Sequence, residues 1–184
     1  MRGLFFSLLL FLIPGVSVFC GIFPDFEVKD RVLVKYRGRE DVVIIPEALG
    51  INRIGERAFA GNMLKSVKIP VGVDVIEDRA FAGCSFLVEV FLPNTVSVIG
   101  YRAFFNCVVL ETINMPYSLR SIEGGAFFNC RSIRAIDMPS TLRSIGPRAF
   151  SGCTGLASLR LSRRTRVGKQ AFMGVPPDRI SYKN

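Results

Sequence analysis

The residue types that most often perform catalysis are either missing from this chain or scattered along it. His is absent from all 184 residues, as is Trp. Without His there is no Ser-His-Asp, Cys-His or HExxH arrangement and no imidazole metal ligand. The carboxylates are dispersed, Ser and Thr have no base nearby in sequence, and Gly124-Gly125 is typical of a turn rather than of a phosphate loop. We therefore expect no enzymatic activity, no metal site and no cofactor.

Four cysteines are the most regularly spaced reactive side chains. Cys84, Cys107, Cys130 and Cys153 lie 23 residues apart. In an exported protein they suggest disulfides, which neighbouring repeats could bring within bridging distance. Asn62 occupies the corresponding position in an earlier repeat, and both side chains can hydrogen-bond to backbone in a buried turn. That exchange favours a ladder of reduced, buried thiols over disulfides, and zinc is disfavoured because the ligands would lie along a line.

Basic side chains could bind anions. Lys and Arg number 24 against 15 Asp and Glu, a formal net charge of +9. A compact C-terminal cluster contains Arg163, Arg164, Arg166 and Lys169. It predicts a dock for anionic lipid headgroups, sulfated glycans or acidic proteins, with a solvated face as the alternative. A second row of arginines directly precedes the recurring Ala-Phe pairs: Arg57, Arg79, Arg102 and Arg148. This row is more typical of a solvated face, whose arginines are partly paired with Glu56, Glu77 or Asp78.

An internal repeat must position all of these side chains. Four consecutive copies of 23 residues span 69–91, 92–114, 115–137 and 138–160 without a gap. An earlier copy begins at Ile45 with one extra residue, and a shortened copy begins at Leu161. The Ala-Phe pair recurs in every copy, with Phe at positions 59, 81, 104, 127, 150 and 172. So short a unit cannot bury its own apolar face, so the copies must stack around one shared core.

The pattern within each unit predicts two walls. Apolar residues alternate before each Pro, which predicts a short strand that the Pro ends. Stacking places these strands in a parallel sheet at about 4.8 Å per repeat. After the turn, Val96, Ile99, Ala103 and Phe104 are expected to point inward from the opposite wall. The six Phe rings would then form a spine along the core, which the small Ala lets the backbone approach closely.

The outward-facing strand positions differ from copy to copy while the core repeats. A solenoid that holds its frame and varies one face has the form of a binding surface. We expect Phe91 to be an aromatic anchor of that surface, although single exposed apolar residues are also common. The predicted protein-binding residues are Lys68, Glu89, Phe91, Thr112, Asn114, Asp137 and Arg160.

The repeat resembles a known family. The unit P-x-x-[LV]-x-x-I-x-x-x-A-F-x-x-C-x-x-L-x-x-[IV]-x-[LIM] is similar to the BspA-like, or treponemal-type, leucine-rich repeat over residues 45 to about 175. The resemblance implies a mainly-β, curved right-handed repeat solenoid with a parallel sheet on one face and short turns or 3-10 segments on the other. It also implies exported bacterial proteins that act in adhesion and protein binding. Asn62 and Val175 depart from the unit, since they stand where it has Cys.

The N-terminal segment has the pattern of a signal peptide over residues 1–20. Arg2 precedes an apolar run from Leu4 to Ile13, and Pro14-Gly15 ends it. A run of about ten residues is too short to span a bilayer, which needs roughly 20. Cleavage after Ser17 or near Cys20 is expected; the alternatives are an uncleaved anchor and a lipoprotein acylated at Cys20. Residues 21–44 predict an N-terminal cap with a hairpin-like pairing, and residues 45–184 a domain of about six repeats.

Together these features predict an exported protein-interaction or adhesion module at the cell envelope. It would be periplasmic, membrane-associated, on the cell surface or secreted. The expected partner is a host extracellular-matrix or envelope protein. The alternative is an electrostatic binder of anionic membrane lipids or sulfated glycans through the C-terminal cluster. Nucleic acid is disfavoured because the protein would be exported.

Overall fold

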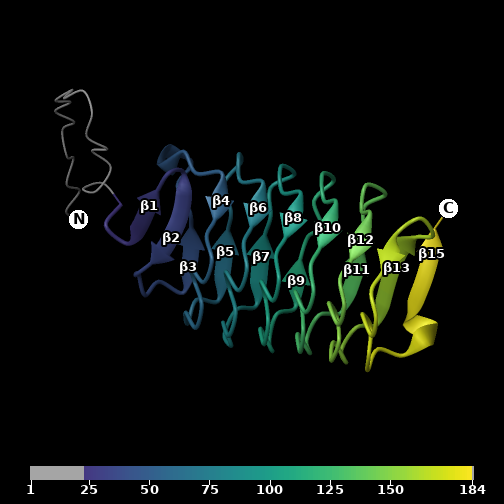
Figure 1. Ribbon diagram of the computed structural model, residues 1–184. Helices are drawn as coiled ribbons and strands as arrows, with labels where there is room; N and C mark the ends of the chain where they lie inside the picture. Colours follow the sequence, from purple (N-terminus) through teal and green to yellow (C-terminus); the bar gives the residue numbers. More distant parts are fainter. Residues whose placement is uncertain (1–22, 184) are drawn as a thin grey trace, which may run out of the picture.

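The computed structural model describes residues 23–183, so the predicted signal peptide lies outside the described residues. These residues form a mainly-β parallel solenoid, in which short strands stack turn upon turn along one axis (Figure 1). Helix in this part of the chain is limited to two 3-10 segments, Glu47–Leu49 and Pro177–Arg179. No helix within it has the length and hydropathy that a bilayer crossing requires.

The strands that end before the prolines form as predicted. Together with two C-terminal strands that no Pro follows, they build a four-stranded parallel sheet and a three-stranded parallel sheet. In the three-residue strands the middle residue, such as Val67 or Val90, is branched, apolar and buried, while its neighbours point outward. The four-stranded sheet contains β3 (Val42–Ile44), β5 (Ser66–Lys68), β7 (Glu89–Phe91) and β9 (Thr112–Ile113); the three-stranded sheet contains β11 (Ala135–Asp137), β13 (Ser158–Ser162) and β15 (Ile180–Lys183).

The opposite wall has the expected turns and, directly before them, a regular ladder that the sequence did not predict. Its two-residue strands pair in parallel and form a ladder that continues along the solenoid, for example Ile76 with Ile99 and Ile99 with Ile122. A strand of two residues is too short to show alternation in sequence. The ladder contains β4 (Arg53–Ile54), β6 (Val75–Ile76), β8 (Val98–Ile99), β10 (Ser121–Ile122), β12 (Ser144–Ile145) and β14 (Arg166–Val167).

The predicted phenylalanine spine is confirmed. Five rings are buried, and the centroids of successive rings from Phe59 to Phe150 lie 4.8, 5.2, 5.2 and 5.0 Å apart in stacked pairs. Phe172 continues the row at 5.8 Å from Phe150 but is only partly buried. The Ala before each Phe is buried as well. The rings are therefore closest between Phe59 and Phe81 and farthest apart at the C-terminal end of the spine.

The N-terminal cap adds one further turn to the solenoid. Strand β1 (Phe26–Lys29) pairs antiparallel with β2 (Val32–Tyr36), and β2 then pairs in parallel with β4. The hairpin turn is Asp30-Arg31, with φ of 50° and 64°. Tyr36 lies 23 residues before Phe59, and its ring stacks on Phe59 at 5.0 Å. Tyr36 thus takes the spine position in a turn that has no Ala-Phe pair.

The cysteine ladder is buried and free of disulfides. Each thiol donates to a backbone carbonyl of an earlier repeat: Cys84 to Phe59 at 3.0 Å, Cys107 to Phe81 at 3.2 Å, Cys130 to Phe104 and Cys153 to Phe127 at 3.1 Å. Burial raises the pKa of Cys84 and Cys153 to about 12, and the pKa of the two central thiols lies well above the usual value. The thiols are thus protonated at neutral pH and unreactive.

Asn62 explains why an amide can replace a thiol in this row. Its side-chain oxygen accepts from the backbone N–H of Leu64 at 3.0 Å, and its amide nitrogen is 3.5 Å from the carbonyl of Gly38. Like the cysteines, it uses its polar atoms on backbone groups inside the turn. In the internal repeats the position therefore holds a small side chain that hydrogen-bonds to the backbone, as the exchange in sequence indicated, whereas Val175 fills it with apolar atoms in the last repeat.

Candidate functional site

The outer face of the four-stranded sheet gathers exposed apolar side chains. Lys68 pairs in register with Ile44 on one side and Phe91 on the other. Val42, at the start of β3, is 62% exposed, Ile44 66% and Phe91 45%. Val42 and Ile44 were not predicted as binding residues, although they flank the strand residue Val43 in the alternation. We call Val42, Ile44, Lys68 and Phe91 the sheet patch.

A shallow groove lies beside the sheet patch where the strands end. It has a volume of about 270 Å³ and is lined by Ile44, Lys68 and Phe91 together with the turn prolines Pro46, Pro70 and Pro93. Val71, also in its lining, is 68% exposed. Because Pro cannot donate a backbone hydrogen bond, this edge presents mainly apolar atoms. The sheet patch is thus continuous with an apolar groove at its edge.

Two other predicted residues, Glu89 and Thr112, pair in register with each other on the same sheet. Glu89 is half-buried and Thr112 exposed, and both lie one pleat away from Phe91. They could therefore form the polar border of the sheet patch.

Asn114 has a structural role at the end of the four-stranded sheet. Its side-chain oxygen accepts from the backbone N–H of Leu92 at 2.8 Å, and its amide donates to the carbonyl of Leu92, also at 2.8 Å. In the preceding repeat the corresponding N–H, that of Ile69, bonds to the backbone carbonyl of Phe91 instead. A side-chain amide therefore replaces backbone pairing where the first sheet stops, before β11.

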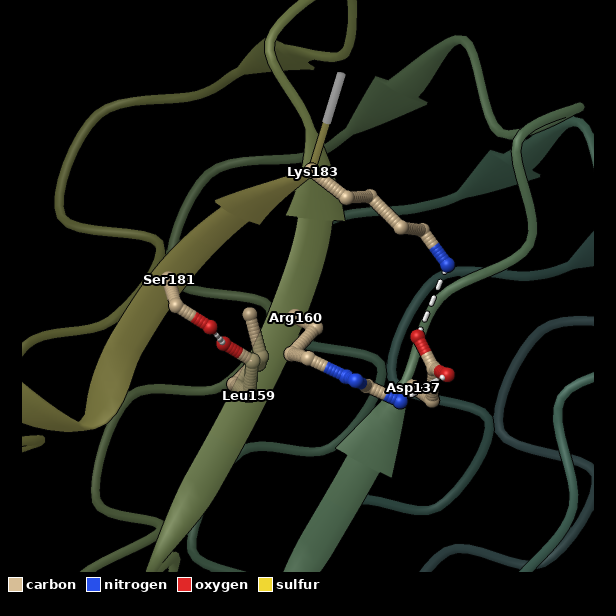
Figure 2. Close-up of polar contacts among 5 residues, drawn as sticks. All are labelled: Asp137, Leu159, Arg160, Ser181 and Lys183. Carbon is tan, nitrogen blue, oxygen red and sulfur yellow. Dashed lines mark hydrogen bonds and ion pairs between the residues drawn. The ribbon is translucent and has the colours of Figure 1, made fainter.

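Asp137 and Arg160 pair with each other on the three-stranded sheet. The Asp137 carboxylate accepts from the Arg160 guanidinium and from the Lys183 amine, both at 2.7 Å (Figure 2). The hydrogen bond from Lys183, assisted by Arg160, holds the pKa of Asp137 below its usual value. Ser181, beside Arg160 on the edge strand β15, donates to the carbonyl of Leu159 at 3.4 Å. These contacts link β11, β13 and β15 in one network on the outer surface.

Only two members of the predicted C-terminal cluster line the same groove. Arg164 and Arg166 line an open groove of about 600 Å³. Arg163 instead lies over the ring of Tyr182, 5.7 Å from its centroid, and Lys169 is exposed outside the lining of the groove. Two arginines that the sequence reasoning missed, Arg120 and Arg143, complete the basic lining. The sequence does contain a signal for these two arginines, because each follows a Leu at the same place in consecutive repeats.

The charge of the solenoid is distributed unevenly. Residues 23–114 contain 11 Lys and Arg against 12 Asp and Glu, a net charge of −1. Residues 115–183 contain 12 against 3, a net charge of +9. The boundary between these two halves coincides with the break between the two sheets. We call residues 23–114 the N-terminal half and residues 115–183 the C-terminal half.

The second arginine row is largely engaged with neighbouring side chains. Arg57, Arg79, Arg102 and Arg148 all have φ of 54–55°, a left-handed conformation that is costly for a residue with a side chain. Gly125 takes the same place in one repeat with φ of 62°. Glu56 lies 3.7 Å from Arg57 and 3.8 Å from Arg79, and Arg102 lies over the rings of Tyr101 and Phe105 at 5.0 and 5.1 Å. The row therefore packs on outer aromatics and one carboxylate, which agrees with a solvated face.

Comparisons with known proteins agree with this architecture. A family model for the BspA type leucine rich repeat region matches six copies over residues 52–176. The solved leucine-rich repeat protein of T. pallidum is 26% identical, with a TM-score of 0.71 over 86% of this chain and 83% of its own. A leucine rich cell surface protein of Faecalibacterium prausnitzii is 28% identical, with a TM-score of 0.67 over 73% of this chain, and a leucine-rich repeat protein of Bacteroides ovatus is 28% identical, with a TM-score of 0.58 over 78%.

The chain spans only part of the last two of these proteins, 36% and 42% of their lengths. No curated protein sequence matches it. The repeat fold is typical of non-enzymatic scaffolds, and the repeats imply a protein-binding module. The spine, the cysteine ladder and the match over most of the solenoid lead to the same assignment: the chain belongs to the BspA-type leucine-rich repeat family.

Proposed function

We propose that this protein is exported and acts at the cell envelope as an adhesion or protein-interaction module that binds its partner through the sheet patch. The observation that carries this proposal is the grouping of Val42, Ile44 and Phe91 on one exposed parallel sheet. Interfaces derive most of their affinity from a few apolar and aromatic anchors within a polar border. Lys68 and Glu89 supply polar groups beside these anchors.

Export rests on different support. The signal-peptide pattern of residues 1–20 precedes the cap, and one solved relative is described as a cell surface protein. The chemistry of the sheet patch suits an extended or flat protein surface that carries its own apolar side chains. We infer that the partner is a host extracellular-matrix protein or another envelope protein.

Export can be tested separately from binding. The full chain is expressed in a bacterial host, and N-terminal sequencing is carried out on the protein from the envelope and medium fractions. We expect a new N-terminus after Ser17 or near Cys20. Retention of the protein with Met1 in the cytosolic fraction would contradict export and leave the binding proposal intact.

Binding is tested by screening the mature chain against purified extracellular-matrix and envelope proteins. We expect Phe91→Ala to weaken the partner identified by at least about 1 kcal/mol, because desolvated aromatic anchors dominate such interfaces. Phe86→Ala is the matched control, since Phe86 is 50% exposed in the same repeat but lies outside the sheet strands. The triple change of Arg163, Arg164 and Arg166 to Ser should leave affinity nearly intact. Equal losses from Phe91→Ala and Phe86→Ala would overturn the assignment of the sheet patch.

A further inference from the structure

We propose that the groove between the last repeats is a binding site for a linear sulfated glycan. This inference is independent of the sheet patch, which lies in the other half of the chain. Four exposed arginines line the open groove of about 600 Å³. They are Arg120, Arg143, Arg164 and Arg166, which we call the arginine groove.

The backbone holds three of these arginines in a row. The N–H of Arg143 donates to the carbonyl of Arg120 at 2.8 Å, and the N–H of Arg166 donates to the carbonyl of Arg143 at 2.9 Å. The row therefore advances by about one strand spacing, 4.7–4.9 Å, per repeat. Arg164 adds a fourth guanidinium from the turn before β14. A row of fixed cations matches a polymer that carries anionic groups along its length better than a single small anion.

In the N-terminal half the same row is not basic from Asn52 to Ser97, and it begins with Arg31 in the cap. Backbone bonds of the same kind connect Arg120 to Ser97, Ser97 to Asp74 and Asp74 to Asn52. The basic lining is thus a property of the last repeats and not of the repeat unit. Among residues 23–183 the ion pairs involve none of the four groove arginines, so their guanidinium groups are available to an external anion.

The remaining lining favours a sugar over a lipid surface. Ser118 and Ser140 present hydroxyls beside the arginines, and the ring of Tyr117 is 76% exposed. An exposed aromatic ring can stack on the apolar face of a sugar ring, and hydroxyls can bond to those of the sugar. The planar guanidinium fork matches the oxygens of sulfate and carboxylate groups. Because the arginines line a hollow rather than a protrusion, a flat membrane would reach them less well than a single chain lying in the groove.

The test uses the mature chain and a size-defined heparin oligosaccharide. We expect the double change Arg120→Ser, Arg143→Ser to lower heparin affinity at least about tenfold. The matched control is Arg131→Ser, Arg134→Ser, which removes the same charge from two exposed positions of the same half outside the groove. The control should lose less than about threefold, because general attraction alone is screened by salt. A control loss equal to that of the groove variant would overturn the proposal.

Two further measurements use the unchanged chain and therefore test the proposal even if a variant folds poorly. In hydrogen exchange of the unchanged chain, heparin should protect residues 117–120, 140–143 and 163–166; protection confined to other segments would overturn it. Vesicles of anionic phospholipid and an acidic peptide are compared with heparin at equal salt concentration. Tighter binding of either one would show that the groove has a different occupant and would also overturn it.

Discussion

The two halves of this solenoid share one core but present different surfaces. The N-terminal half has a net charge of −1 and an outer sheet with exposed Val42, Ile44 and Phe91. The C-terminal half has a net charge of +9, and its outer sheet carries the ion pairs of Asp137 with Arg160 and Lys183. The spine, the cysteine ladder and the far-wall ladder continue through both. A stacked repeat can thus change its surface chemistry halfway along without changing its frame.

The shared frame predicts the largest effect. Phe104→Ala in the middle of the spine should cost about 3–5 kcal/mol of the free energy of unfolding, because the stacked neighbours cannot close the cavity. Phe172→Ala should cost clearly less, because Phe172 is only partly buried and has a ring on one side alone. Chemical denaturation of both variants measures the difference. Equal losses would contradict a spine that is shared by both halves.

The boundary between the halves predicts the next effect. Asn114→Ala should destabilise the fold by about 1–3 kcal/mol, because it leaves the N–H and carbonyl of Leu92 without their partners. Thr112→Ala is the control, since Thr112 is exposed on β9, two residues before Asn114. Thermal and denaturant melts would measure both. Equal losses of stability from Asn114→Ala and Thr112→Ala would contradict the claim that the Asn114 side chain joins the repeats at this boundary.

The smallest effect belongs to the charged network of the C-terminal half. The pKa of Asp137 is lower in the folded state than in the unfolded state. The ionised carboxylate therefore stabilises the fold at pH values above its unfolded pKa, and that stabilisation is lost as the pH falls through its folded pKa. Its side chain is 51% exposed, so we expect Asp137→Asn to cost less than about 1 kcal/mol at neutral pH. The difference from the unchanged chain should vanish in acid. The control is Asp41→Asn, which removes a single exposed ion pair with Lys65 in the other half. A loss of stability from Asp137→Asn that stays constant with pH would contradict the network.

Much of the frame could be predicted from sequence because the core positions repeat. The Ala-Phe pair, the cysteine row and the strands before each Pro recur at a fixed spacing, and each lies where the spacing placed it. Tyr36 was missed as a spine residue because Lys35-Tyr36 replaces Ala-Phe in that turn. The far-wall ladder was missed because two-residue strands leave no alternation to detect.

The surface was less predictable, since which exposed residues meet depends on neighbouring turns. Asp137 and Arg160 were foreseen as outward-facing, but not that they bind each other and Lys183. Arg120 and Arg143 were visible as a repeated position, yet only the stacked turns bring them beside Arg164 and Arg166. Asn114 was expected to face a partner, whereas its amide bonds to the backbone of Leu92. Such contacts run between repeats, where spacing alone does not identify the partners.

The central claim is that the two halves carry two independent binding surfaces. One measurement tests it most directly: affinities of the unchanged chain, of Phe91→Ala and of Arg120→Ser, Arg143→Ser for both the protein partner and heparin. We predict a crossed result, in which Phe91→Ala weakens only the protein partner and the double arginine change weakens only heparin. Parallel losses of both ligands in either variant, with melting temperatures unchanged, would contradict it.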